Sequence, residues 1–231
     1  GRLILIIFYN FHYHFLMLVL NFNGVNKLIS DLIKNGYLKS DSIIDAFSKV
    51  NRVEFVTDDM ESQADVDVAL PIGYGQTISQ PLTVAFMLEL LDPRAGQIIL
   101  DVGMGSGWTT ALLAEIVGKA GKVIAVERIK ELMERGKKNV DKYDYVGRGI
   151  AEFYLADGSR GLPQKAPFDR ILVSASSPSI PQPLKDQLKI GGKMVLPVRN
   201  SIFYLEKKSE QEFFQEEFPG FSFVPLINEN K

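Results

Sequence analysis

The sequence predicts an α/β fold in which a doubly wound, mostly parallel sheet carries helices on both faces. From residue 80 onward, apolar segments of strand length alternate with segments of helical periodicity. The strand segments are almost entirely apolar, which is typical of parallel strands that are buried on both faces. The chain of 231 residues is also long enough for one sizeable α/β domain with small additions.

Segments with helical periodicity precede and follow an acidic segment, 57–67, that is expected to form a surface loop. Further such segments connect the strand segments. The expected helices are 25–36, 40–50, 80–91, 109–118, 129–140 and a short helix with a turn in 181–192. Ser40 is a candidate N-cap, and Gly136 lies inside its helix without ending the pattern.

Seven segments are expected to form the sheet. These strands are 97–103, 122–127, 151–157, 168–176, 193–198, 202–208 and 221–227, and an acidic stretch separates the last two. We expect one domain over 25–231, with N-terminal helices in 25–56 and the core in 70–231.

The chain begins with an apolar extension, expected over 1–24. Residues 3–20 contain no Asp, Glu, Lys or Arg and are just long enough to span a bilayer. Polar Asn10, His12 and His14 disfavour a span, and no secretory cleavage pattern follows. We expect an extension unrelated to the main domain, such as a translated upstream stretch, with a membrane anchor as the alternative.

Composition excludes several kinds of chemistry. The net charge of −2 gives no broad basic field for a nucleic-acid partner. Cysteine is absent, which excludes disulfides, thiolate metal sites and cysteine nucleophiles. The two histidines lie in the extension, so Ser–His–Asp hydrolysis and histidine-ligated zinc are implausible in the main domain, and we expect no metal.

A glycine-rich loop follows the first strand of the alternation. Asp101 precedes Gly103, Gly105 and Gly107, and such closely spaced glycines let a backbone lie against a ligand. Dinucleotide folds prefer the G-x-G-x-x-G spacing, and a carboxylate here would repel a pyrophosphate. The loop instead suits a ligand with a cationic amine and a sulfonium.

Two further acids end the next two predicted strands. Glu127 can accept hydrogen bonds from both hydroxyls of a ribose, and Asp157 can accept from an adenine amino group beside Gly158. Alone, Glu127 could be a solvated strand-end charge and Asp157 part of an Asx turn. Together with the glycine loop they predict an adenosine site. Upstream, in 70–81, Ser79 could be either a helix N-cap or a catalytic residue.

Several motifs, in this order, resemble the protein-L-isoaspartate (D-aspartate) O-methyltransferase family. They are LPIGYGQTISQP, LDVGMGSGW, AVER, ADGSRGLPQKAPFDRILVSAS, IPQPLKDQLKIGGKMVLPV and FVPL. The resemblance covers about residues 26–227, and YGQTISQP is its most specific part. It implies a Rossmann-like class I S-adenosylmethionine-dependent methyltransferase fold with a seven-stranded sheet.

The resemblance also implies an activity. A methyl group would pass from S-adenosylmethionine to the carboxylate of L-isoaspartyl and D-aspartyl residues in damaged proteins, and the ester would collapse to a succinimide. Ser79 matches the active-site serine. Substrate contacts are expected at Ile72, Gly73, Thr77 and Ser79. Cofactor contacts are expected at Gln76, Thr77, Ile78, Ser79, Asp101, Gly103, Gly105, Gly107, Glu127, Arg128, Asp157 and Gly158.

The expected partners are isoaspartyl-containing proteins and peptides, with a monomeric enzyme in the cytoplasm. A carboxylate acceptor is ionised near neutral pH, so the reaction needs no general base. Three residues depart from the family pattern: Met104, Trp108 and Arg199. The alternatives are a related methyltransferase acting on a small molecule or RNA, an NAD-dependent oxidoreductase and a membrane-tethered module without activity.

Overall fold

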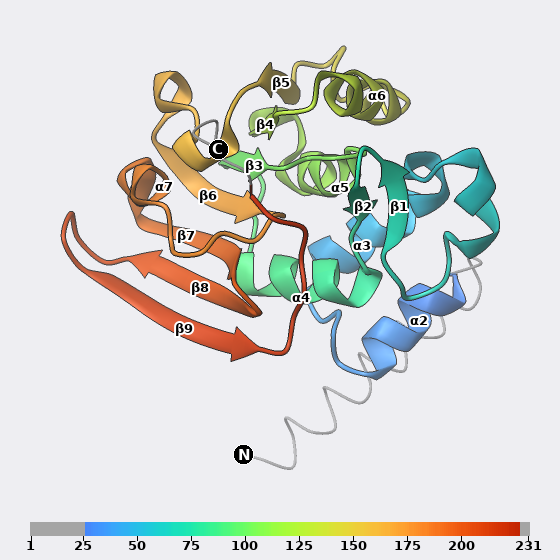
Figure 1. Ribbon diagram of the computed structural model, residues 1–231, viewed down its shortest axis with the longest axis horizontal. Helices are drawn as coiled ribbons and strands as arrows, with labels where there is room; N and C mark the ends of the chain where they lie inside the picture. The colour runs from blue at the N-terminus through green and yellow to red at the C-terminus, as the bar shows by residue number, and fades with distance from the viewer. Residues whose placement is uncertain (1–25, 227–231) are drawn as a thin grey trace.

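The computed structural model describes residues 26–226 (Figure 1). The expected extension 1–24, its apolar run 3–20 and residues 227–231 lie outside the described residues. Within 26–226, every helix is too short or too polar to cross a bilayer.

A seven-stranded sheet forms the centre of the molecule, which confirms the expected fold class. Its order is β5-β4-β3-β6-β7-β8-β9, as Figure 1 shows. The strands are β3 (Ile98–Val102), β4 (Lys122–Glu127), β5 (Ala151–Leu155), β6 (Phe168–Val173), β7 (Leu188–Val198), β8 (Ser201–Lys207) and β9 (Phe213–Pro219). The first five run parallel to one another, β8 pairs antiparallel with β7, and β9 pairs antiparallel with β8. A separate hairpin joins β1 (Leu70–Gly73) to β2 (Gln76–Ile78).

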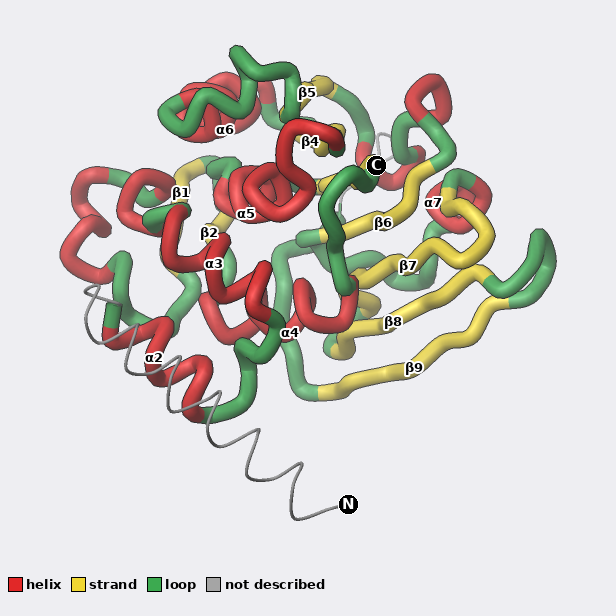
Figure 2. Tube along the Cα trace, turned by 180° about the vertical axis from the view of Figure 1, so that it is seen from behind, coloured by secondary structure: helices red, strands yellow, loops and turns green. Residues whose placement is uncertain are grey.

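Helices cover the two faces unequally. One face carries α4 (Pro81–Leu91), α5 (Trp108–Val117) and α6 (Lys130–Asp141), with α2 (Lys27–Lys34) and α3 (Asp41–Lys49) packed outside. Figure 2 shows α3, α4 and α5 grouped on one side of the sheet. The other face carries α7 (Gln182–Asp186) and two 3-10 turns, Gly158–Arg160 and Pro163–Lys165. The remaining 3-10 turns are Arg52–Phe55, Asp58–Gln63 and Gly118–Ala120.

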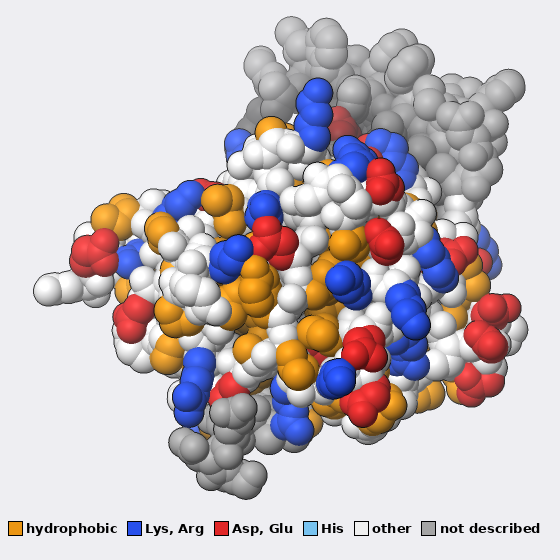
Figure 3. Space-filling view, turned by 90° about the horizontal axis from the view of Figure 1, so that it is seen from above, with side chains coloured by type: hydrophobic (Ala, Val, Ile, Leu, Met, Phe, Trp, Pro, Cys, Tyr) orange, Lys and Arg blue, Asp and Glu red, His pale blue; other side chains and the backbone are white. Residues whose placement is uncertain are grey.

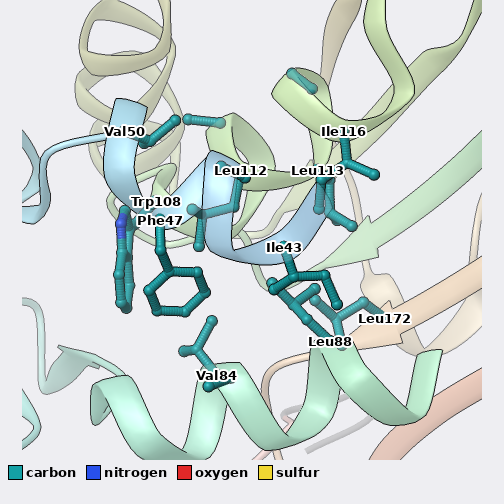
Figure 4. Close-up of a cluster of buried hydrophobic side chains, with 14 of the residues drawn as sticks. Ile43, Phe47, Val50, Val84, Leu88, Trp108, Leu112, Leu113, Ile116 and Leu172 are labelled. Carbon is teal, nitrogen blue, oxygen red and sulfur yellow. The ribbon is translucent and has the colours of Figure 1, made fainter. Parts of the chain in front are cut away.

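The alternation of side chains along the strands explains these two layers. In β3, Ile99 joins the apolar cluster under the large helical layer, whereas Leu100 and Val102 join the cluster on the opposite face. Figure 4 shows how α3, α4 and α5 interlock in the first cluster, with the Phe47 ring edge-on to Trp108 at 5.5 Å. Burial of one large apolar side chain, such as Leu, Ile or Phe, stabilises the folded state by roughly 1.5–3 kcal/mol.

The expected strand at 221–227 is wrong. The seventh strand is β9, which occupies the acidic segment assigned to a connection. Because β9 lies at the sheet edge and is mostly exposed, its polar side chains hide the strand pattern. Residues 221–226 instead run across the end of β6, making a single bridge between Ser176 and Pro225.

Three smaller expectations also change. The helix in 181–192 ends at Asp186, and β7 already begins at Leu188. The loop 57–67 contains a 3-10 turn. Ser79 is not the N-cap of α4: Gln80 holds that position, and the Asp67 carboxylate accepts a hydrogen bond from the Leu82 amide at 2.8 Å.

The position of Gly136 inside α6 has a packing reason. A Cβ at this position would meet the end of Met104 and lie 2.8 Å from the Gly105 carbonyl oxygen. The missing side chain therefore lets α6 pack directly on the glycine loop that follows β3.

We expect Gly136→Ala to lower the free energy of unfolding by about 1–2 kcal/mol. The overlap with a backbone carbonyl should outweigh the helix-propensity gain of about 1 kcal/mol. Denaturant unfolding measures the change, and Lys137→Ala on the exposed face of the same helix is the control. A Gly136→Ala protein as stable as the wild type would contradict this account of the packing.

Candidate active site

The candidate site lies where the strand order reverses. After β3, the chain adds β4 and β5 on one side and then returns to place β6 on the other. Such a switch point opens a crevice at the carboxyl ends of the strands. A cavity lies there, lined by Val102 and Gly103 after β3, Glu127 at the end of β4, and Ser174 and Ala175 after β6.

The glycine loop forms the floor of this cavity. The amides of Gly103 and Met104 both donate to the Val126 carbonyl, at 2.9 and 3.3 Å, so the loop stays against β4. Gly107 has a left-handed φ of 91°, and a Cβ there would lie 2.8 Å from the Gly136 carbonyl oxygen. A side chain at this position would therefore separate the loop from α6.

Glu127 joins three segments around the cavity. One carboxylate oxygen accepts from the Gly105 amide at 3.1 Å, and the other accepts from the amides of Arg128 and Ile129 at 2.8 and 3.0 Å. The side chain is almost fully buried yet lines the cavity. Each carboxylate oxygen has more than one lone pair, so both can also accept from a ligand's hydroxyl groups.

Asp101 lies beneath the glycine loop and is fully buried. One carboxylate oxygen accepts from the hydroxyls of Thr109 and Thr110, at 3.0 and 2.6 Å. Within 26–226, the other oxygen has no hydrogen-bond partner. Burial raises the pKa of Asp101 to about 6, against the effect of the two threonine hydrogen bonds. A buried, unsatisfied carboxylate oxygen suits a nearby cationic group.

Asp157 forms the Asx turn that was its alternative interpretation. One oxygen of its carboxylate accepts from the Ser159 amide at 2.9 Å and from the Ser159 hydroxyl at 2.7 Å. Gly158 lines the cavity. A Cβ on Gly158 would collide with the Val102 side chain, so only glycine allows this close approach.

The β1–β2 hairpin supplies the other wall. At its tip, Gly73, Tyr74 and Gly75 all adopt left-handed conformations, with φ of 87°, 56° and 69°. β2 then carries Gln76 to the cavity, followed by Thr77, Ile78 and Ser79. Arg135 of α6 donates to the Ile72 carbonyl and ties the hairpin to the helical layer.

Ser79 lies between two hollows. It lines the cavity, and with Thr77, Ser174 and Val224 it also lines an adjoining groove. The Ser79 hydroxyl makes no hydrogen bond to any described residue, while its carbonyl accepts from Arg52 at 3.1 Å. The hydroxyl is therefore available to a molecule in either hollow.

Most of the residues expected at the site line the cavity. They are Gln76, Thr77, Ile78, Ser79, Gly103, Gly105, Glu127, Arg128 and Gly158. Asp101, Gly107 and Asp157 lie behind this wall, and Ile72 and Gly73 belong to the hairpin without lining it. Sequence reasoning assigned no role to the remaining wall residues, chiefly Trp108, Ser174, Ala175 and Val224–Leu226.

The C-terminal part of the wall could have been inferred from one motif. FVPL ends in Leu226, and the Leu226 amide donates to the Ser176 carbonyl at 2.7 Å. In Figure 1 the chain after β9, in red, returns across the end of β6. The local pattern instead predicted a strand at 221–227, whereas the segment makes only a bridge.

The polar groups around the cavity fit an adenosine ligand that carries a positively charged chain. Glu127 offers acceptors at one strand end, Gly158 allows close approach of a flat ring, and the Asp101 carboxylate lies under the loop. Among residues 26–226, no cluster of acidic or histidine side chains could hold a metal ion.

Comparisons with known proteins agree with this geometry. The family model described as Protein-L-isoaspartate(D-aspartate) O-methyltransferase (PCMT) matches residues 23–231. The protein-L-isoaspartate O-methyltransferase of Methanopyrus kandleri is 45% identical over 207 residues, covering 88% of this chain and 91% of that protein. The Aeropyrum pernix protein of the same name is 43% identical, covering 88% of this chain and 79% of that protein.

Solved structures give the same result. A protein-L-isoaspartate O-methyltransferase structure has a TM-score of 0.79 at 29% identity, covering 87% of this chain and 65% of that chain. A Plasmodium falciparum beta-aspartate methyltransferase, crystallised with S-adenosyl-L-homocysteine, has a TM-score of 0.78 over 87% of this chain and 97% of that chain. At 23% identity, it supports the fold alone. With the family model matching most of its length, this chain belongs to the protein-L-isoaspartate(D-aspartate) O-methyltransferase family.

Proposed function

We propose that this protein is an S-adenosylmethionine-dependent methyltransferase acting on the carboxylate of L-isoaspartyl and D-aspartyl residues in damaged proteins. The observation that carries the proposal is the position of Ser79 between the strand-end cavity and the adjoining groove. A methyl donor in the cavity and an acceptor in the groove would then meet at this residue. Family membership supports the same activity.

The cavity is the proposed cofactor site. S-adenosylmethionine supplies an electrophilic methyl group on a positively charged sulfur. Glu127 would accept hydrogen bonds from the ribose, and Asp157 and Gly158 would bound the adenine. Asp101 would favour the cationic end of the cofactor through its buried negative charge. Gln76, Thr77 and Ile78 would cover the bound molecule from the hairpin side.

Ser79 would orient the acceptor and not act as a nucleophile. An isoaspartyl carboxylate is already ionised near neutral pH, so no residue has to remove a proton. The Ser79 hydroxyl can donate one hydrogen bond to a carboxylate oxygen and hold the other oxygen toward the methyl donor. Alignment of the reacting atoms and exclusion of water can together supply several kcal/mol.

Surface charge favours a protein acceptor over RNA. On the face shown in Figure 3, Lys and Arg side chains alternate with Asp and Glu and form no single basic field. A small-molecule acceptor remains the alternative that the assay below tests. We also propose a monomeric, cytoplasmic enzyme whose catalytic domain spans 25–231.

The activity predicts discrimination between two peptides that differ in one linkage. Labelled methyl groups from S-adenosylmethionine should enter an isoaspartyl peptide and not its aspartyl twin. S-adenosylhomocysteine, but not NADH, should raise the melting temperature, because a ligand that binds only the folded state stabilises it. Equal labelling of both peptides would reject the substrate assignment, and stabilisation by NADH alone would reject the cofactor.

Ser79→Ala tests the acceptor role. We expect kcat on the isoaspartyl peptide to fall by about tenfold or more, because misorientation of a reacting group is costly. The affinity for S-adenosylhomocysteine should change little. Ser48→Ala is the control, since that hydroxyl bonds only the Ile44 carbonyl of its own helix. Full activity of the Ser79→Ala enzyme would show that the serine does not orient the acceptor.

Asp101 predicts a pH dependence of stability. Its folded-state pKa of about 6 lies above the ordinary carboxyl value, so the folded protein binds this proton more tightly than the unfolded chain. The contribution of Asp101 therefore becomes more favourable as the pH falls from 7 to 5. Relative to Asp101→Asn, the wild-type free energy of unfolding should rise by about 1 kcal/mol over that interval. Denaturant unfolding at both pH values measures it, and a constant difference would contradict the prediction.

A further inference from the structure

A buried arginine lies behind Ser79. Arg52 is only 4% exposed, and its guanidinium donates to four backbone carbonyls. Nη1 reaches Ala64 and Val66, at 2.9 and 3.4 Å, and Nη2 reaches Val68 and Ser79, at 2.8 and 3.1 Å. Among the hydrogen bonds of residues 26–226, none joins this guanidinium to a carboxylate. Burial lowers the pKa of Arg52 to about 10 and outweighs the nearby carboxylates of Asp67 and Asp65, which favour the charge. Burying this charge is therefore unfavourable, and the arrangement calls for a reason beyond packing.

The same guanidinium contacts the wall of the cofactor cavity. Its central carbon lies 5.3 Å from the centre of the Trp108 ring, within range of a cation–π interaction. Trp108 begins α5 and lines the cavity. The same ring also packs edge-on against Phe47 (Figure 4). Arg52 thus connects the cavity wall to the Ser79 backbone.

Ser79 and the residues that follow it are held by two side chains, Arg52 and Asp67. The segment whose carbonyls bind Arg52 also contains Asp67. The Asp67 carboxylate accepts from the Gln80 side chain at 3.1 Å and from the Leu82 amide at 2.8 Å. The residues on either side of the Ser79–Gln80 bond are therefore tied to one loop by two different side chains.

We propose that Arg52 is a positioning residue that fixes Ser79, in the acceptor groove, relative to Trp108, in the wall of the cofactor cavity. The guanidinium is planar and has several N–H donors, so it can bind these carbonyls while it lies against an aromatic ring. The ammonium group of lysine cannot reproduce this arrangement. The inference rests on the proposed methyl transfer, because it gives the Ser79–Trp108 distance a catalytic purpose.

Arg52→Lys is the principal test, since it retains the charge and loses the fork. We expect kcat on the isoaspartyl peptide, at saturating cofactor, to fall by about 10- to 100-fold. Trp108 is the chain's sole tryptophan, so intrinsic fluorescence reports directly on this contact. The emission of Arg52→Lys, and its change on adding S-adenosylhomocysteine, should differ from those of the wild type.

Arg170→Lys is the matched control. Arg170 is also buried, at 7% exposure, and its Nε donates to the Leu91 carbonyl at 2.7 Å. It lies near the start of β6, away from the candidate site at the carboxyl ends of the strands. This variant should lose a comparable amount of stability while keeping the wild-type kcat and Trp108 emission. An Arg52→Lys enzyme that is folded by circular dichroism and has the control's kcat and emission would overturn the proposal.

Trp108→Phe gives a second test that does not depend on an Arg52 variant folding. It leaves the four carbonyl contacts in place and weakens the ring interaction, because tryptophan is the best cation–π partner. At saturating cofactor, we expect kcat to fall several-fold. An unchanged kcat would overturn the link between the two walls. A wild-type protein that binds S-adenosylhomocysteine but methylates no isoaspartyl peptide would instead reject the proposed function.

Discussion

The Glu127 carboxylate accepts hydrogen bonds from three backbone amides, those of Gly105, Arg128 and Ile129, and so joins the glycine loop to the start of α6. Hydrogen bonds to an ionised acceptor are among the stronger ones in proteins. The close approach of Gly136 to the loop completes the same contact from the helix side. The floor of the cavity depends on this junction, because the glycines of the loop have no side chains that could hold it in place.

A buried negative charge lies beneath that floor. Asp101 is satisfied on one oxygen by Thr109 and Thr110 and has no described partner on the other, and burial raises its pKa. Such an arrangement destabilises the folded protein at neutral pH. Binding of a cation would offset that cost, which is a common compromise between stability and activity.

The two walls of the site differ in how far sequence could predict them. Gly103, Glu127 and Gly158 follow consecutive strands, and parallel strands bring their carboxyl ends to one edge. Their proximity therefore followed from the alternation of strands and helices. The hairpin wall and the return of Val224–Leu226 depend on contacts between distant segments, such as the bond between Leu226 and Ser176. A local pattern does not encode such contacts. It left Ser79 as either a helix N-cap or a catalytic residue, and only the family resemblance favoured the catalytic role.

By itself, the sequence determined the α/β class, the glycine loop and the acids at the strand ends, because periodicity and residue type at strand ends are local properties. Tertiary structure decided which edge segment becomes β9, why α6 contains Gly136 and where Asp101 directs its carboxylate. It also placed Arg52 between Ser79 and Trp108. An exposed edge strand lacks an apolar pattern, and a buried arginine resembles any surface arginine in the sequence. Each gains its meaning only from the atoms that surround it after folding.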